Sequence, residues 1–268
     1  MAESILLLWL EGPMQSWGTR SRWDVRDTGL DPTKSGVIGL IGCAMGLNRD
    51  DLELERLDRD LLFGVRVDRP GVVSTDYHTV TGYHCTAAGK FKHSGGTARS
   101  LAKAREHGES TIVSPRDYLH DAAFLVALAS DDHALLRQLA GELKHPDWPG
   151  DLQCPKWPLY LGRKSCVPTR PIFYRLTDEY DDFEIALHKV PWAPPRSPRS
   201  LQRAKQSPEL LAWIECQDGG RERPDEEYER QDSLRLNQLR FYDFRRCRRI
   251  VIPAGSVPCE PVVVEVPA

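Results

Sequence analysis

Residues 5–18, ILLLWLEGPMQSWG, decide the fold, because an unbroken apolar run leads directly into a polar stretch bracketed by glycines. A short apolar run ahead of turn residues predicts a buried strand over residues 5–10. Gly12 and Gly18 are expected to let the backbone turn. Trp17 offers a flat face that can either stack on a base or pack in a core. A ligand-binding loop and a buried structural corner therefore both fit this stretch.

The composition is that of a folded chain with an unremarkable overall charge. The 268 residues are 40% hydrophobic, enough for one large domain or two small ones. Lysine and arginine number 36 against 39 aspartate and glutamate, a formal charge of −3. Bulk charge therefore does not indicate a nucleic-acid-binding protein, and the question rests on how the basic residues are distributed.

The cysteines and apolar runs indicate a reduced, cytoplasmic protein. The seven cysteines form no CxxC pair, and no basic region precedes the short N-terminal apolar run. The apolar stretches at 5–10 and 37–47 are much shorter than the roughly 20 residues of a membrane-spanning helix. Histidine and cysteine do not occur at zinc-ligand spacing. We therefore expect no membrane contact, no metal and no cofactor.

The order of the expected elements predicts an α+β, ferredoxin-like domain over residues 1–170. After the first strand we expect a helix at 35–47, a helix at 50–59, a strand at 61–67, a polar arm at 76–116, a strand at 118–129, a helix at 131–144 and a short strand at 158–161. This is the order of a split βαβ unit. The arm carries glycines without sustained apolar periodicity, so it is expected to leave the domain as an extended hairpin.

The remaining residues, 171–268, are expected to form a small β-rich sub-domain. Strands are predicted at 172–176 and 262–266, on either side of a segment at 190–208 that is rich in proline and arginine. Residues 240–249 hold five arginines and three aromatics, and strand alternation would put basic and apolar groups on opposite faces. We interpret that strand as a solvated face or a protein contact.

The start of the helix at 35–47 is a candidate anion site. Thr33, Lys34 and Ser35 precede or open this helix, where free backbone N–H groups favour a phosphate. The pattern is not a phosphate-binding Walker loop, because the residue before the lysine is not glycine. Ordinary capping of the helix with a solvated lysine explains the same residues equally well.

Basic and aromatic side chains alternate along the arm in a way that suits single-stranded nucleic acid. They are His78, Tyr83, His84, Lys90, Phe91, Lys92, His93, Arg99, Lys103 and Arg105. A solvated loop is the alternative. Lys92 and His93, with Tyr77 or Tyr83, could also serve as the acid and base of metal-independent RNA cleavage.

A further phosphate-binding candidate follows the expected strand at 158–161. Gly162 is followed by the adjacent cations Arg163 and Lys164, which combine a flexible backbone with positive charge. Motifs of hydrolases and dinucleotide-binding oxidoreductases are missing from the sequence. The residues themselves therefore point to a protein that grips a phosphate chain.

Four segments in order resemble the Cas-five family of CRISPR-associated proteins, in its type I-E form. They are LLLWLEGPMQSWG, PTKSGVIGLIGCAMG, TDYHTVTGY and YLGRKSCVPTRPI. The resemblance covers the chain to about residue 175 and is looser beyond. It implies a ferredoxin-like domain of the RAMP superfamily with a projecting β-hairpin thumb. Type I-C relatives cut precursor RNA with a Tyr, Lys and His set, whereas in type I-E a separate subunit, CasE, cuts, so the resemblance implies a non-catalytic protein here.

The resemblance also implies partners and RNA-binding residues. The partners are the 5′ handle of the CRISPR RNA, the backbone subunit CasC and the large subunit CasA, in an antiviral Cascade complex that also contains CasB and CasE and meets target DNA indirectly. The implied RNA-binding residues are Gln15, Ser16, Trp17, Gly18, Arg20, Thr33, Lys34, Ser35, His78, Tyr83, Lys90, Lys92, His93, Arg99, Arg105, Arg163 and Lys164. The alternative catalytic set is Lys92, His93 and Tyr83.

Overall fold

A computed structural model describes residues 4–19, 26–81, 111–144, 155–180, 182–193, 209–216, 227–236 and 240–258. The helical elements are α1 (Lys34–Met45), α2 (Leu52–Asp60), α4 (His133–Leu143), α5 (Phe183–Lys189) and the short 3-10 helix η2 (Ala254–Ser256). The strands are β1 (Ile5–Gln15), β2 (Leu62–Arg69), β3 (Val72–Thr81), β4 (Thr111–Ala129), β5 (Phe173–Thr177), β6 (Glu209–Glu215), β7 (Glu227–Arg235) and β8 (Phe241–Pro253).

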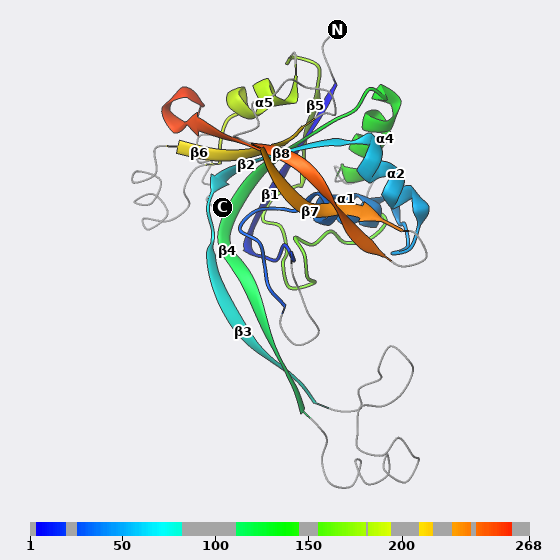
Figure 1. Ribbon diagram of the computed structural model, residues 1–268, viewed down its shortest axis with the longest axis vertical. Helices are drawn as coiled ribbons and strands as arrows, with labels where there is room; N and C mark the ends of the chain where they lie inside the picture. The colour runs from blue at the N-terminus through cyan, green and yellow to red at the C-terminus, as the bar shows by residue number, and fades with distance from the viewer. Residues whose placement is uncertain are drawn as a thin grey trace, which may run out of the picture.

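The strands form one antiparallel sheet whose first half has the expected ferredoxin-like order. The sequence across the sheet is β5-β1-β4-β2-β6-β8-β7, and β3 pairs with β4 outside this path (Figure 1). The four strands β5, β1, β4 and β2 give the ferredoxin-like order that the sequence predicts. The last strand of this unit, however, is β5 and not the strand expected at 158–161, so the unit extends past residue 170. The C-terminal strands β6, β8 and β7 continue the sheet from the edge of β2, so the part after residue 170 is built onto the same sheet.

Strand β1 is buried on both faces, which explains its continuous apolar run. Leu6, Leu8 and Leu10 join the cluster under α1 and α4, and Ile5 and Leu7 join the cluster under α5. The strand expected at 5–10 is therefore confirmed, and it is longer than expected.

The extension of β1 to Gln15 corrects the expected role of Gly12. This glycine pairs with Ala122 within the strand rather than turning the chain. A Cβ at Gly12 would lie 2.8 Å from the carbonyl oxygen of Val167. The glycine is needed because another segment crosses β1 closely, and the polar loop begins only at Ser16.

Helix α1 confirms the helix expected at 35–47 and has a cap at each end. The Thr33 hydroxyl accepts a hydrogen bond from the Gly36 N–H at 3.2 Å, and Gly46 ends the helix with φ of 76°. Between them, Gly42 lets Leu54 of α2 pack against the helix without room for a Cβ. Helices α2 and α4 likewise confirm the expected helices at 50–59 and 131–144.

A buried arginine fastens α5 to the second face of the sheet. Arg66 of β2 is fully buried and ion-pairs with Asp68 at 2.5 Å. Its guanidinium also donates to the carbonyl oxygens of Leu187 and Val190 at the end of α5. Both faces of the sheet are therefore covered at its centre, one by α1 and α4 and the other by α5 (Figure 1).

The stem of the expected arm is a long two-stranded hairpin that leaves the body of the molecule (Figure 1). Its ladder runs from the pair Val72 and His120 to the pair Thr81 and Thr111. It therefore begins four residues before the expected position 76. Residues 82–110, where most of the basic and aromatic residues of the arm occur, lie outside the described residues. We call this hairpin, β3 with the first half of β4, the thumb.

Two predicted strands differ from the structure. Residues 158–161 do not form a strand, and Pro158 has no N–H for a ladder. In β8, Arg245 is buried while Phe241 and Phe244 are exposed, so the expected separation of basic and apolar faces is wrong. The reason is that Asp232 of β7 provides a buried partner for Arg245 at 2.7 Å.

The strand expected at 262–266 lies outside the described residues. Within the described ranges, none of the helices combines the length and the apolar character needed to cross a membrane.

Candidate nucleic-acid interface

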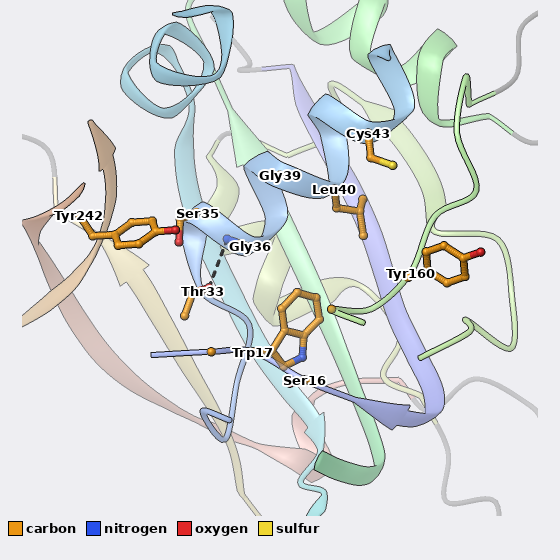
Figure 2. A pocket seen from close by; sticks show the side chains of 12 residues that line it. Ser16, Trp17, Thr33, Ser35, Gly36, Gly39, Leu40, Cys43, Tyr160 and Tyr242 are labelled. Carbon is orange, nitrogen blue, oxygen red and sulfur yellow. Dashed lines mark hydrogen bonds between the residues drawn. The ribbon is translucent and has the colours of Figure 1, made fainter. Parts of the chain in front are cut away.

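Four segments of the chain meet around a pocket of about 340 Å³ on the exposed side of α1. Figure 2 shows Tyr242 of β8 and Tyr160 of the 155–172 segment at opposite sides of this pocket, with α1 between them. Its lining comprises Ser16, Trp17, Gly18, Thr33, Ser35, Gly36, Gly39, Leu40, Cys43, Tyr160, Gly162 and Tyr242. The polar loop, the helix start and the segment before Arg163, each a candidate from sequence, are therefore brought together.

Gln15 and Trp17 build the buried corner that supports this pocket. The Gln15 amide is fully buried, and its nitrogen donates to the carbonyl oxygens of Leu10 and Ala122. Its oxygen accepts a hydrogen bond from the Trp17 indole N–H at 3.0 Å. Trp17 is 2% exposed and packs where a Cβ on Gly36 would contact its ring. Gln15 is therefore structural, and Trp17 presents only a small part of its ring to the pocket.

The start of α1 is already occupied by carboxylates of the protein itself. The Lys34 N–H donates to Asp232 at 2.9 Å, and the Lys34 ammonium donates to both carboxylate oxygens of Glu215 at 2.9 Å. Lys34 is 2% exposed. The capping interpretation therefore describes this helix start, except that the lysine is buried in an ion pair instead of solvated. Asp232 takes the position in which the sequence suggested a phosphate.

The carboxylate of Asp232 is held in its charged form by its neighbours. Burial acts to raise its pKa, but the charge and hydrogen bonds of Arg245, the Lys34 N–H and the charge of Arg230 outweigh this effect. The net result is a pKa below the usual value for aspartate. The charged Asp232 thereby complements the positive end of the α1 dipole.

Gly162 joins the polar loop to the 155–172 segment. The Ser16 N–H donates to the carbonyl oxygen of Leu161 at 2.9 Å. Gly162 has a φ of 112°, and a Cβ there would overlap the carbonyl group of Ser16. Only glycine fits this position, for both conformation and space. The crossing fixes one wall of the pocket and places Arg163 directly beside it.

Arginine side chains gather where the thumb meets the body. The Arg163 guanidinium lies 4.8 Å from the centre of the Tyr118 ring and donates to the carbonyl oxygen of Arg26 at 3.3 Å. Arg26 forms an isolated bridge with Arg116 of β4. Arg116 and Tyr118 are two residues apart on one strand and so share a face. We call Arg116 and Arg163 the thumb-root arginines.

The other candidate residues occupy different surroundings. Thr33 is buried as the helix cap, and Ser35 is half-buried at the pocket. His78 lies on the thumb, 3.6 Å from the Asp76 carboxylate. Lys164 is exposed. The remaining candidates lie outside the described residues: Arg20, Tyr83, Lys90, Lys92, His93, Arg99 and Arg105.

Sequence reasoning missed several pocket residues. Tyr160, Tyr242 and Gly39 come from separate elements, and only the sheet order brings β8 beside α1. The open position of Gly39 is a property of the fold, because a Cβ there meets nothing within 4 Å. Cys43 is half-buried in the pocket, and burial raises the pKa of its thiol.

Comparison with known proteins is consistent across sequence and structure. Residues 5–246 match the family model described as CRISPR-associated protein (Cas_Cas5). The chain is 34% identical over 197 residues to the CRISPR system Cascade subunit CasD of Escherichia coli (strain K12), covering 70% of this chain and 78% of the relative.

Two solved structures extend this likeness over nearly the whole chain. One, from a CRISPR RNA-guided surveillance complex, has a TM-score of 0.66 and 31% identity and covers 95% of this chain and 93% of the other. A second, described as the crystal structure of a Cas protein, has a TM-score of 0.61 and 32% identity and covers 96% and 99%. With a family match over most of its length, the chain belongs to the Cas5 family of CRISPR-associated proteins.

Proposed function

We propose that this protein is a non-catalytic, RNA-binding subunit of a type I-E Cascade complex that holds the 5′ handle of the CRISPR RNA. The observation that carries the proposal is the convergence of the polar loop, the α1 start and the 160–162 segment on one pocket beside the thumb-root arginines. Partly open tyrosines next to cationic side chains are the groups that grip single-stranded RNA. The likeness to CasD and to a surveillance-complex protein supports the assignment.

We further propose that the thumb packs against the backbone subunit CasC. One face of the thumb exposes Val73, Tyr77 and Val113, with Tyr77 70% exposed. These residues share a face because Tyr77 pairs with Pro115 and Thr79 pairs with Val113. A two-stranded ribbon is only marginally stable alone, so covering this apolar face would stabilise it. The large subunit CasA would then dock beside the body, in a cytoplasmic complex that also holds CasB and CasE.

The proposal assigns no RNA cleavage to this chain. The catalytic alternative depends on Tyr83, Lys92 and His93, which lie outside the described residues, and the described part of the chain offers no observation that favours it. We therefore expect that CasE alone cuts the precursor RNA.

A single gel experiment tests both statements. The purified protein is incubated in chelator with labelled repeat-containing precursor RNA and with mature CRISPR RNA, and binding and cleavage are scored together. Binding without cleavage is expected. Cleavage at the repeat that is lost in His93→Ala would replace the proposal with an endoribonuclease. If neither RNA binds, the test is repeated with CasC present, and failure there rejects the RNA-holding role.

Gly39 allows the pocket itself to be tested without disturbing the core. Gly39→Phe projects a side chain into open space that lines the pocket. Gly255 of η2 also has open space around its Cβ position but does not line the pocket, so Gly255→Phe is the matched control. We expect Gly39→Phe to weaken handle binding and Gly255→Phe to leave it unchanged. Equal binding by both variants would show that RNA does not use this pocket.

A further inference from the structure

We infer that the thumb-root arginines, Arg116 and Arg163, form a seat for one backbone phosphate of the bound RNA. This inference rests on the proposed function and adds a specific contact to it. Arg163 was a general RNA-binding candidate from sequence, whereas Arg116 was not a candidate. What distinguishes the pair is a combination: each guanidinium has a buried nitrogen without a hydrogen-bond partner among the described residues, as Arg245 and Arg248 also have, but neither forms an ion pair with a described carboxylate.

Each guanidinium holds a buried nitrogen without a hydrogen-bond partner among the described residues. These atoms are Nε of Arg116 and Nη1 of Arg163. Buried polar atoms are almost always hydrogen-bonded, so two such atoms in neighbouring cations indicate a missing acceptor. Both residues are half-buried, so neither side chain is fully enclosed by the protein.

Carboxylates of the described residues do not serve as that acceptor. No ion pair with a described carboxylate is formed by either guanidinium, in contrast to Arg245, Arg66 and Arg69, each of which pairs with an acidic residue. Asp76 stands opposite Arg116 in the thumb ladder, but its carboxylate pairs with His78 instead. Among the described residues, therefore, no carboxylate neutralises the positive charge of the thumb-root arginines.

The surroundings fix the orientation of the seat. Arg163 is held over the Tyr118 ring and against the carbonyl oxygen of Arg26. Arg116 stands two residues before Tyr118 on the same face of β4. A planar guanidinium held in this way can donate two parallel hydrogen bonds to phosphate oxygens. Gly162, next to Arg163, lines the α1 pocket, so a strand leaving the seat can continue into that pocket.

The ligand chemistry that fits best is a phosphodiester of single-stranded RNA. Two guanidinium groups and an adjoining pocket suit a bent backbone with a neighbouring nucleotide better than a free anion. A free phosphate shares the charge but not the pocket. Inorganic phosphate is therefore one arm of the test.

The test measures RNA affinity as a function of salt for Arg116→Gln, Arg163→Gln and the control Arg56→Gln. Arg56 lies on α2 and pairs with Glu53 and Asp60. Its substitution removes the same charge at a different place on the protein. Each thumb-root variant is expected to bind RNA about tenfold more weakly than the wild type. The negative slope of log K against log salt should become shallower by about 0.7. Arg56→Gln should match the wild type.

A second arm locates the phosphate. CRISPR RNAs that each carry one neutral methylphosphonate in the handle are bound by the wild type and by Arg163→Gln. We expect one linkage at which the neutral group weakens wild-type binding but no longer matters in the variant. A variant that is weaker yet keeps the wild-type sensitivity at every linkage would show that Arg163 acts only through structure.

The outcomes separate this inference from the proposed function. If the wild type binds RNA and both variants bind with its affinity and salt slope, the seat is wrong and the RNA-holding role stands. If inorganic phosphate at about 10 mM fully displaces RNA from the wild-type protein, a free anion is the ligand instead. If the wild type binds no RNA, alone or with CasC, both are rejected. If Arg163→Gln does not fold, the salt dependence and the methylphosphonate series are measured with Arg116→Gln instead, and the same outcomes apply.

Discussion

The ammonium group of Lys34 lies 2.9 Å from each carboxylate oxygen of Glu215, joining the first residue of α1 to the last residue of β6. The lysine side chain is 3% exposed and the glutamate side chain 13%. Glu215 also accepts a hydrogen bond from the Phe63 N–H of β2 at 3.0 Å. The ion pair therefore ties the helix to the C-terminal half of the sheet.

Lys34→Met should destabilise the protein strongly, because it removes the ammonium group that pairs with the largely buried Glu215 carboxylate. We expect a loss of about 3 kcal/mol in the free energy of unfolding, measured by urea denaturation. Arg56→Met removes an exposed pair on α2 and should cost under about 0.5 kcal/mol. If Lys34→Met is as stable as the wild type but binds RNA poorly, the lysine contacts RNA after all and the structural role is wrong.

Gly39→Ala should stabilise the protein, whereas Gly36→Ala should not. Alanine at position 39 meets nothing and gains about 0.5–1 kcal/mol of helix propensity. At position 36 the added Cβ would lie 2.8 Å from the Thr33 hydroxyl oxygen and 3.1 Å from the Trp17 ring. Thermal unfolding of the two variants should therefore shift in opposite directions. A rise in both midpoints would mean that the Trp17 corner yields easily.

Gly162→Ala should be destabilising by more than about 1 kcal/mol, because its φ of 112° and the adjacent Ser16 carbonyl both exclude a side chain. The measurement is chemical denaturation, with Gly255→Ala as the matched open position. Handle binding should fall together with stability, since this crossing forms a wall of the pocket. A neutral effect on stability would show that the two loops can separate.

Asp232 should make the free energy of unfolding depend on pH in the acidic range. Because its folded pKa is lowered below the unfolded value of about 4, its contribution is complete above that value and is lost as the pH falls through the folded pKa. The difference in unfolding free energy between the wild type and Asp232→Asn should be constant above about pH 5 and shrink below pH 4. Urea titrations at pH values above and below this range provide the check. A difference that does not change with pH would contradict the assigned role of this carboxylate.

RNA bound in the pocket should protect the Cys43 thiol from alkylation. The thiol lines the pocket, and its raised pKa requires a mildly alkaline reaction. Cys216 is equally half-buried but does not line the pocket, so peptide mapping offers an internal control. The buried Cys247, with a pKa raised to about 11, should stay unmodified in either state. Equal protection of Cys43 and Cys216 would point to a general change in the protein rather than pocket filling.

Local patterns in the sequence were sufficient to predict the N-terminal half of the sheet. The apolar run of β1 and the Asp132 cap of α4 each specify an element through neighbouring residues. The ferredoxin-like strand order followed from such elements, although its last strand was expected at 158–161 and is β5 instead. The exact ends of the elements did not follow, because the continuation of β1 past Gly12 depends on the segment that crosses it at Val167.

The candidate site was predicted as regions more than as residues. The loop at 16–18, the helix start and Gly162 do meet at one pocket. Sequence could not show that Lys34 and Gln15 are used inside the protein, because their partners lie as far away as Glu215 and Ala122. Nor could it place Tyr242 or Arg116, whose positions follow from long-range strand pairing.

The 19 residues of β4 belong to two structures at once. One end pairs with β3 in the thumb, and the other is held between β1 and β2 in the body. Where the two meet, Asp121 has a φ of 56°, and its carbonyl oxygen accepts a hydrogen bond from Arg69 at 2.8 Å. The thumb therefore cannot swing on a flexible linker. The direction of the thumb is set by the central strand. Partners that contact both the thumb and the body must therefore be spaced to fit this fixed direction.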